Sequence, residues 1–182
     1  MTVSSLLMAA VATAASVTAP SPPVSAPPAA TAPIAILDAA SQQRLLASPD
    51  HRLAANKRLV YDMYRIVLQA GVVDRAKDFI ATDYIQHNPN ADQGLAGLVA
   101  YVTSTRPVRP VLDHLEIPMI HIMAEGDYVT IAFARPEKDA NGASYVTTWF
   151  DLFRIADGRI AEHWDPMLRS DARIDPNKQK LR

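Results

Sequence analysis

The sequence contains no cysteine among its 182 residues. Disulfides, thiolate catalysis and cysteine-ligated zinc or iron–sulfur sites are therefore excluded. The chain also lacks an excess of charge of either sign, because 18 basic residues stand against 19 acidic ones and no segment carries a basic stripe. Binding to nucleic acid or to an anionic membrane needs clustered lysine and arginine, so neither partner is expected.

Several catalytic and cofactor motifs are also missing. The sequence has no Gly-x-Ser-x-Gly elbow for serine-dependent hydrolysis and no glycine-rich phosphate-binding loop. Its five histidines show no His-x-x-x-His spacing of the kind that binds zinc. We therefore expect neither a cofactor nor a metal ion.

The first 37 residues contain no Asp, Glu, Lys, Arg or His. Residues 5–19 form an alanine-rich apolar run that is too short for a membrane span, which needs about 20 strongly apolar residues. The run fits the core of a signal peptide with small-residue cleavage sites, although no basic residue precedes it, so an uncleaved leader is the alternative. We expect export to the periplasm or the medium if this segment is a signal peptide, and a cytoplasmic protein otherwise.

The domain boundaries follow from composition and from the spacing of apolar residues. Residues 20–33 contain six prolines and are expected to form an extended linker, so residues 1–33 are set aside as signal peptide and linker. We expect a lead-in segment over residues 34–51, one folded domain over 52–168 and a polar tail over 169–182.

Helices are predicted first along the chain and strands afterwards. The helices are expected over residues 38–48, 52–70, 73–80 and 94–105, and residues 82–89 are expected to form a turn. The strands are expected over residues 112–123, 128–134, 144–155 and 159–167, with a polar loop over 136–143. This order indicates an α+β fold in which helices cover one face of a curved, mainly antiparallel sheet.

The connection Ala156-Asp157-Gly158 sets the register of the last two predicted strands. Gly158 suits the left-handed position of a three-residue hairpin loop, in which Ile155 pairs with Arg159. Side chains alternate along a strand, so one face then carries Trp149, Asp151, Phe153, His163 and Asp165, and the other carries Phe150, Leu152, Arg154, Ile160, Glu162 and Trp164. A two-residue turn would shift the register by one residue and break this grouping.

The first of these faces brings together two carboxylates, an imidazole and an indole. If helices cover it, desolvation and the mutual repulsion of Asp151 and Asp165 make each carboxylate a stronger base, as general-base catalysis requires. If it faces solvent, it is an ordinary polar strand face with a cross-strand pair of Asp151 and His163. Periodicity alone leaves both interpretations open.

Four segments in order resemble the SnoaL-like polyketide cyclases of the nuclear-transport-factor-two-like superfamily. They are NKRLVYDMYRIVLQAGVVDRAKDFIATDY (56–84), YIQHNP (84–89), AEGDYV (124–129) and FDLFRIADGRIAEHWD (150–165). The resemblance covers residues 52–167. It implies a cone-shaped α+β barrel, in which a strongly bent sheet wraps three helices around an apolar pocket, and a homodimer packed sheet to sheet.

The resemblance also implies a chemistry without metal or cofactor, in which an aspartate takes a proton next to a carbonyl and closes a ring by aldol condensation. The base of those cyclases aligns with Asp165. A histidine that assists it lies fourteen residues earlier, where this chain has Asp151. This departure replaces a proton donor with a second carboxylate, so the cyclase mechanism does not transfer intact.

Other residues have both a functional and a structural interpretation. His163 either orients Asp165 or acts as an acid, or it is a structural histidine. His87 and Asn88 lie before Pro89 in a loop, where functional groups are frequent, and Asn88 either donates to an enolate oxygen or caps the turn. Trp149 is a candidate cavity wall and Tyr64 a candidate ligand-binding hydroxyl, but either could simply pack in the core.

Three functions remain open from the sequence. The first is an enzyme that cyclises, isomerises or dehydrates a small apolar carbonyl compound, with Asp165 as base supported by Asp151 and His163. The second is a non-catalytic exported domain that binds a small apolar ligand. The third is an interaction domain whose exposed sheet face pairs with another chain.

Overall fold

The computed structural model of the protein describes residues 35–169, so the predicted signal peptide and linker lie outside the described residues. Four α-helices are α1 (Ala39–Leu45), α2 (His51–Met63), α3 (Ala76–Phe79) and α4 (Gly94–Thr105). A π-helix, η1 (Tyr64–Gln69), continues α2, and a 3₁₀ turn, η2 (Val73–Arg75), precedes α3. The strands are β1 (Ile80–Gln86), β2 (Met119–Glu125), β3 (Tyr128–Lys138), β4 (Ser144–Ala156) and β5 (Arg159–Trp164).

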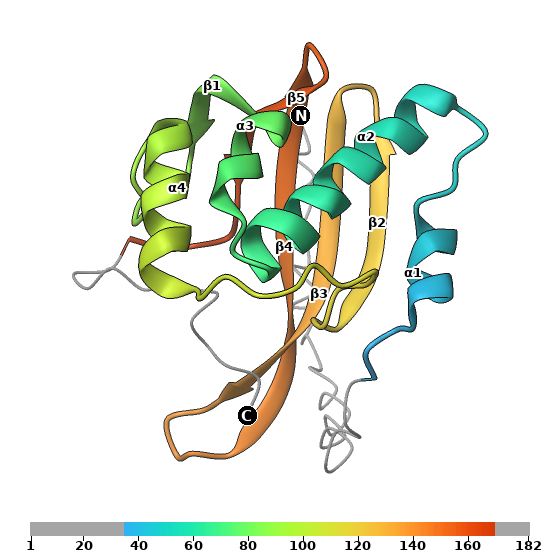
Figure 1. Cartoon of the computed structure of the whole chain (residues 1–182). Coiled ribbons are helices and arrows are strands. Elements are labelled where there is room, and N and C mark those ends of the chain that lie inside the picture. The colour runs from blue at the N-terminus through green and yellow to red at the C-terminus, as the bar shows by residue number, and fades with distance from the viewer. Residues whose placement is uncertain (1–34, 170–182) are drawn as a thin grey trace, which may run out of the picture.

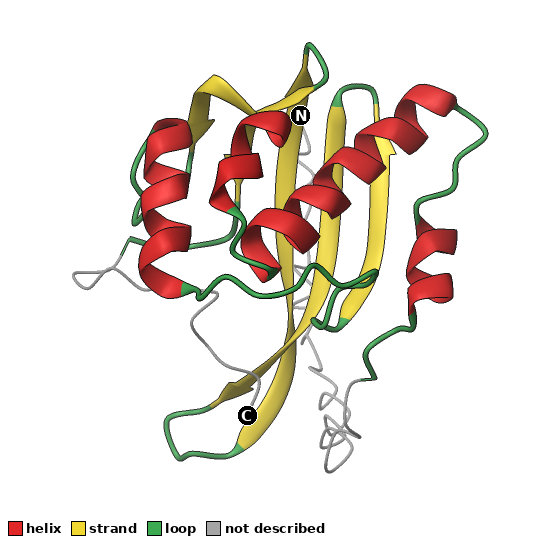
Figure 2. Cartoon of the chain, viewed as in Figure 1, coloured by secondary structure: helices red, strands yellow, loops and turns green. Residues whose placement is uncertain are grey.

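The predicted α+β class is confirmed. The five strands form one sheet in the order β1-β5-β4-β3-β2, in which only the β1–β5 pair is parallel. Helices α2, α3 and α4 lie on one face of this sheet, and α1 lies beside β2 (Figures 1 and 2). The apolar core fills the space between these helices and the sheet, because that face of the strands carries fully buried residues such as Val129, Ile131 and Ile160.

Helix α2 and its continuation anchor the helical layer. Asp50 caps α2 by accepting the backbone N–H groups of Arg52 and Leu53. The predicted helix over 52–70 is confirmed, but its last turns widen into the π-helix, a distortion that is frequent at functional sites. Tyr64 is the first residue of this π-helix, and its side chain reaches Asp151 on β4.

The predicted strand over residues 112–123 is wrong in its first half. Leu115 is fully buried, as a strand residue would be, but its backbone pairs with a side chain instead of a strand. The buried amide of Gln42 on α1 accepts the N–H of Leu115 at 2.9 Å and donates to its carbonyl at 2.8 Å. One glutamine therefore satisfies the backbone that a neighbouring strand would otherwise have paired, and β2 begins only at Met119.

The turn expected over residues 82–89 is also wrong, because most of it is strand β1. This strand lies at the edge of the sheet and pairs with β5, with Gln86 opposite His163. The pairing joins residues 77 positions apart along the chain, so no local pattern announces it. As a result, the segment from Tyr84 to Asn88 lies beside the end of β5.

The last hairpin has a shorter turn than predicted, but it still places Asp151, His163 and Asp165 on one face of the sheet. Ala156 pairs with Arg159, so the loop has two residues, Asp157 and Gly158, both with the positive φ of a type I′ turn (48° and 70°). The predicted three-residue register is therefore wrong. Ile155 pairs with Ile160, which lies in the core and not on the opposite face.

A β-bulge compensates for the shorter turn. Arg154 pairs with Glu162 while Ile155 pairs with Ile160, so Ala161 is an extra residue in β5. The bulge shifts the register by one more position and pairs Phe153 with His163. The face predicted to hold Asp151, His163 and Asp165 is thereby restored, and it faces the helices.

Within residues 35–169, none of the helices has the length and apolar character needed to cross a bilayer.

Candidate functional site

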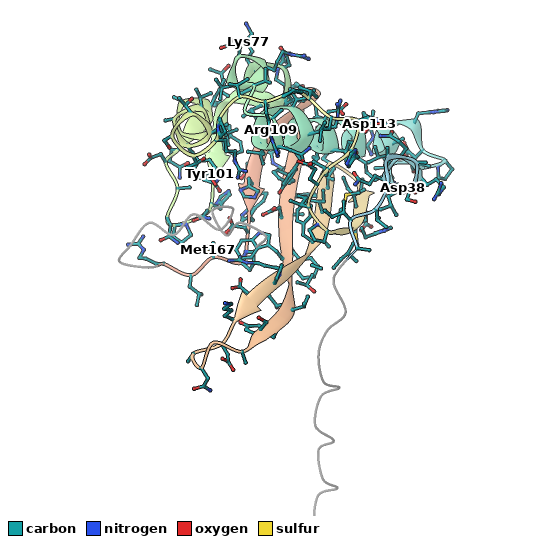
Figure 3. The ribbon with its side chains drawn as sticks, turned by 60° about the horizontal axis from the view of Figure 1, so that its bottom comes forward. Asp38, Lys77, Tyr101, Arg109, Asp113 and Met167 are labelled. Carbon is teal, nitrogen blue, oxygen red and sulfur yellow. The ribbon has the colours of Figure 1, made fainter. Side chains whose placement is uncertain are left out.

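A cavity of about 410 Å³ lies between the helices and the strands β1, β4 and β5. Its wall includes apolar side chains from η1, α4 and the sheet, such as Leu68, Leu98 and Phe153, and polar groups gathered at the ends of β1 and β5. Tyr101 lines it from α4 and is labelled in Figure 3, together with Met167, whose chain segment follows β5. Its volume lies within the range of small-molecule sites.

Asp151 on β4 is the most enclosed carboxylate of the cavity, with 6% of its surface exposed. Its Oδ1 accepts the indole N–H of Trp149 at 2.9 Å and lies 3.1 Å from Nε2 of His163. Its Oδ2 accepts the hydroxyl of Tyr64. Three protein groups therefore hold this carboxylate, as a buried charge requires.

The orientation of His163 follows from Gln86. The Oε1 atom of Gln86 accepts the backbone N–H of Asn88 at 2.9 Å, so this end of the amide is the acceptor. The same oxygen lies 2.9 Å from Nδ1 of His163, which must therefore carry a proton. The contact between Nε2 and Asp151 needs a further proton, so Asp151 and His163 share one proton between them.

Asp165 follows β5 and lines the cavity with a half-buried side chain. Its Oδ2 accepts the side-chain amide of Asn88 at 2.7 Å, and its Oδ1 accepts the backbone N–H of Met167 at 3.0 Å. Asn88 in turn accepts the N–H of Asn90 through Oδ1 at 2.8 Å. Asn88 thus caps its turn through Oδ1 and holds Asp165 through one N–H of its amide group.

Two tyrosine hydroxyls complete the polar end of the cavity. Burial raises the pKa of Tyr64 well above its ordinary value, and the charge of Asp151 and the hydrogen bond to it raise it further. Burial likewise raises the pKa of Tyr84, with smaller contributions from the charges of Asp151 and Asp165. Both phenols therefore keep their protons at any physiological pH.

Asp151, His163 and Asp165 also form a group of potential metal ligands. One ligand atom each from Asp151, His163 and Asp165 lies within 4.8 Å of the others. Nε2 of His163 already faces Asp151, however, and the Trp149 N–H points at the same Asp151 oxygen. An N–H donor at that oxygen repels a cation, so the donor set fits a shared proton better than a metal ion.

The structure brings six of the seven predicted site residues to the cavity: Tyr64, Asn88, Trp149, Asp151, His163 and Asp165 line it. His87 does not line it. Its ring stacks on Trp164 at 4.4 Å, and its Nε2 binds Glu162 at 2.8 Å on the opposite face of the sheet. Glu162 also binds Arg154 there.

Sequence reasoning missed Tyr84 and Gln86. Both belong to the YIQHNP segment, whose alternation as a strand would have placed positions 84, 86 and 88 on one side and His87 on the other. That alternation was obscured because the segment was interpreted as a turn. Gln86 is central to the site, since its amide contacts Tyr84, Asn88 and His163.

Comparison with known proteins gives similar folds at low identity. A candidate polyketide cyclase from Acidithiobacillus ferrooxidans is 17% identical, with a TM-score of 0.45 and coverage of 65% of this chain and 89% of that chain. A candidate SnoaL-like polyketide cyclase from Jannaschia sp. CCS1 is 16% identical, with a TM-score of 0.46 and coverage of 66% and 91%. An LEH-like epoxide hydrolase from M. tuberculosis is 17% identical, with a TM-score of 0.46 and coverage of 63% and 83%.

These structural likenesses carry no argument about the reaction, and no curated protein matches the chain. The family is established separately, because residues 60–163 match the SnoaL-like domain. This match spans more than half of the chain and contains Tyr64, Asp151 and His163. The chain therefore belongs to the family of SnoaL-like domain proteins.

Proposed function

We propose that the cavity binds a small, mostly apolar carbonyl compound and catalyses proton transfer at carbon without a cofactor. The reaction class includes aldol-type cyclisation, isomerisation and dehydration. The observation that carries the proposal is a half-buried carboxylate, Asp165, in a partly apolar cavity beside a buried pair that shares a proton. A base, a nearby proton and partial exclusion of water are what such a reaction needs.

Asp165 is the general base in this proposal. An ionised carboxylate offers about four acceptor positions, and two at Asp165 are used by Asn88 and Met167. Asp151 has three protein partners, two of them on one oxygen. Asp165 therefore retains more capacity to take a proton from a ligand.

His163 is a positioning residue in this scheme. Both of its ring nitrogens are engaged, one with Gln86 and one with Asp151, so neither faces a ligand without a bond being broken. Its ring also stacks on Phe153 at 4.8 Å, which fixes its plane. The Asp151–His163 pair keeps the polar end of the cavity ordered and places a shared proton near Asp165.

The proposal is tested by hydrogen–deuterium exchange at the α-carbon of β-tetralone, a bicyclic ketone, followed by NMR in D₂O. The wild type should accelerate the exchange, and Asp165→Asn should reduce the acceleration by at least about 100-fold, the usual contribution of a general base. Glu162→Gln on the opposite face is the matched control and should retain it. Full acceleration in Asp165→Asn would reject Asp165 as the base.

A second outcome of this experiment separates an enzyme from a binding domain. If the wild type binds β-tetralone and returns it with no accelerated exchange, the cavity acts as a ligand-binding site for such compounds. The carboxylates would then orient the ligand through hydrogen bonds, and Asp165→Asn would change affinity and not rate.

The outer face of the sheet is proposed to pair with a second copy of the chain. A row of side chains runs across four strands in register on this face: Met123, Thr130, Leu152 and Trp164. Phe150 on the same face is 50% exposed. We expect Phe150→Glu to convert a dimer into a monomer in analytical ultracentrifugation, and Val108→Glu, an exposed position elsewhere, to leave the dimer intact. A wild-type monomer would refute the pairing.

A further inference from the structure

Tyr84 is a buried phenol with no role in the mechanism proposed above. It lies on β1, is 5% exposed and lines the cavity together with Asp151 and Asp165. Its phenol is the second such group at the polar end of the cavity. The first, Tyr64, already donates its proton to Asp151.

The hydrogen bonding of Tyr84 is determined by Gln86. Because Oε1 of Gln86 is the acceptor for the Asn88 backbone, its other terminal atom is the amino group Nε2. This Nε2 lies 3.1 Å from the hydroxyl of Tyr84, so Gln86 donates and Tyr84 accepts. The bond leaves the proton of Tyr84 unused, and within residues 35–169 we find no acceptor for it.

We propose that Tyr84 is a catalytic residue whose O–H binds the carbonyl oxygen of the ligand and stabilises the enolate. This inference rests on the proposed function of Asp165. In the step, the α-carbon gives its proton to the Asp165 carboxylate, and the electrons of that C–H bond form a carbon–carbon double bond. The π electrons of the carbonyl move onto its oxygen, which the Tyr84 hydroxyl binds.

The surroundings of Tyr84 favour hydrogen bonding over proton release. Burial, assisted by the charges of Asp151 and Asp165, raises the pKa of Tyr84, so its proton stays on the phenol. The Gln86 amide restrains the hydroxyl from the other side, which reduces the reorganisation needed when charge develops on the ligand. A fixed donor of this kind strengthens its bond as the carbonyl becomes an enolate.

The lining also defines the charge of the ligand. Asp165 brings negative charge, His163 already faces Asp151, and no lysine or arginine is among the described residues that line the cavity. An anionic ligand would lose its hydration without gaining a cationic partner. The site therefore suits an uncharged carbonyl compound and disfavours a carboxylate of the same size.

Three probes test the inference by direct binding: β-tetralone, tetralin, which lacks the oxygen, and the anion β-naphthoate. In the wild type we expect β-tetralone to bind about 10-fold more tightly than tetralin, the value of one hydrogen bond, and β-naphthoate to bind more weakly than either. Tyr84→Phe should remove the preference for β-tetralone and leave tetralin affinity unchanged. Tyr128→Phe, on the outer face, is the control and should behave as the wild type.

An infrared measurement provides a signature that a packing role of Tyr84 would not produce. The carbonyl stretch of bound β-tetralone should move to lower frequency in the wild type and in Asp165→Asn, and should return toward the free value in Tyr84→Phe. Exchange at the α-carbon should fall about 100-fold in Tyr84→Phe, as for the loss of one enolate donor.

The outcomes distinguish the two proposals. An unshifted carbonyl stretch in the wild type, or an unchanged shift in Tyr84→Phe, overturns the role of Tyr84 and leaves the Asp165 test standing. Undiminished exchange in Asp165→Asn, with the carbonyl shift present, overturns the base and retains Tyr84 as the carbonyl-binding group. Equal loss of tetralin and β-tetralone affinity in Tyr84→Phe shows that the residue only packs.

Discussion

Two histidine–carboxylate pairs lie on opposite faces of β5. On the inner face, His163 and Asp151 are 3.1 Å apart and their side chains are 12% and 8% exposed. On the outer face, His87 and Glu162 are closer, at 2.8 Å, but are 37% and 17% exposed. The separation of the atoms alone would make the outer pair the stronger candidate for a site.

The surroundings reverse that ranking. Glu162 also binds Arg154, and hydrogen bonding to His87 followed by that to Arg154 lowers the pKa of the Glu162 carboxyl, so it remains a stable anion in contact with solvent. The inner pair has no such cation and depends on the hydroxyl, indole and amide groups of the protein. Asp151 shares a proton with its histidine and has no arginine beside it, so enclosure and partners matter more than distance.

Deleting Ala161 should have the largest effect, because it removes the bulge that decides which face each pair occupies. Without this residue the two-residue turn would direct His163 and Asp165 outward and Glu162 and Trp164 into the core. We expect the free energy of unfolding to fall by more than about 4 kcal/mol. Urea denaturation measures this, with deletion of Asn141 in the exposed β3–β4 loop as the control, expected to cost about 1 kcal/mol or less.

Removal of one carboxylate from each pair should give the next largest difference. Asp151→Ala leaves the Tyr64 hydroxyl, the Trp149 indole and His163 without their acceptor, at an expected cost of about 3–5 kcal/mol in the free energy of unfolding. Glu162→Ala breaks a pair in contact with solvent, and its expected cost is much smaller. Equal losses in urea denaturation would show that the two faces are energetically alike.

Removal of each imidazole should separate the pairs by function. His163→Ala should slow α-proton exchange of β-tetralone about 10-fold, because Asp151 and its neighbours lose their fixed positions, whereas His87→Ala should not change it. Equal exchange rates in His163→Ala and His87→Ala would reduce His163 to a packing role.

Alkaline titration of the two buried phenols on the inner face, Tyr64 and Tyr84, should show the smallest effect. The pKa values of Tyr64 and Tyr84 are raised in the folded protein above about 10, their value in an unfolded chain. The stability that these phenols contribute is complete below pH 10 and is lost as the pH rises beyond it, because only the unfolded chain then ionises. Ultraviolet absorbance should show the ionisation of Tyr64 and Tyr84 only together with unfolding.

Local patterns predicted most of the fold. The helix over 94–105 and the strands that begin at residues 128, 144 and 159 begin where expected, since each depends on its own apolar spacing and turns. The errors lie where one segment depends on a distant one. Strand β1 exists because β5 pairs with it, and the segment around Leu115 is not a strand because Gln42 replaces its partner.

The candidate site shows the same division. Side-chain alternation grouped Asp151, His163 and Asp165 correctly on one face, although the predicted residue pairing between β4 and β5 was wrong. Gln86 and Tyr84 were missed because their place beside β5 depends on the parallel pairing of β1. Alternation within the segment could have grouped the two residues, but it could not have placed them beside β5.

The bulge at Ala161 has a consequence for comparing this chain with its relatives. A short turn with one extra strand residue, and a longer turn with a regular strand, present the same side chains to the interior. A relative with an extra residue in the turn near position 157 should therefore lack the extra strand residue at position 161. An alignment that scores turn and strand independently would exchange His163 with its neighbours and assign the acidic groups of some homologues to the wrong surface.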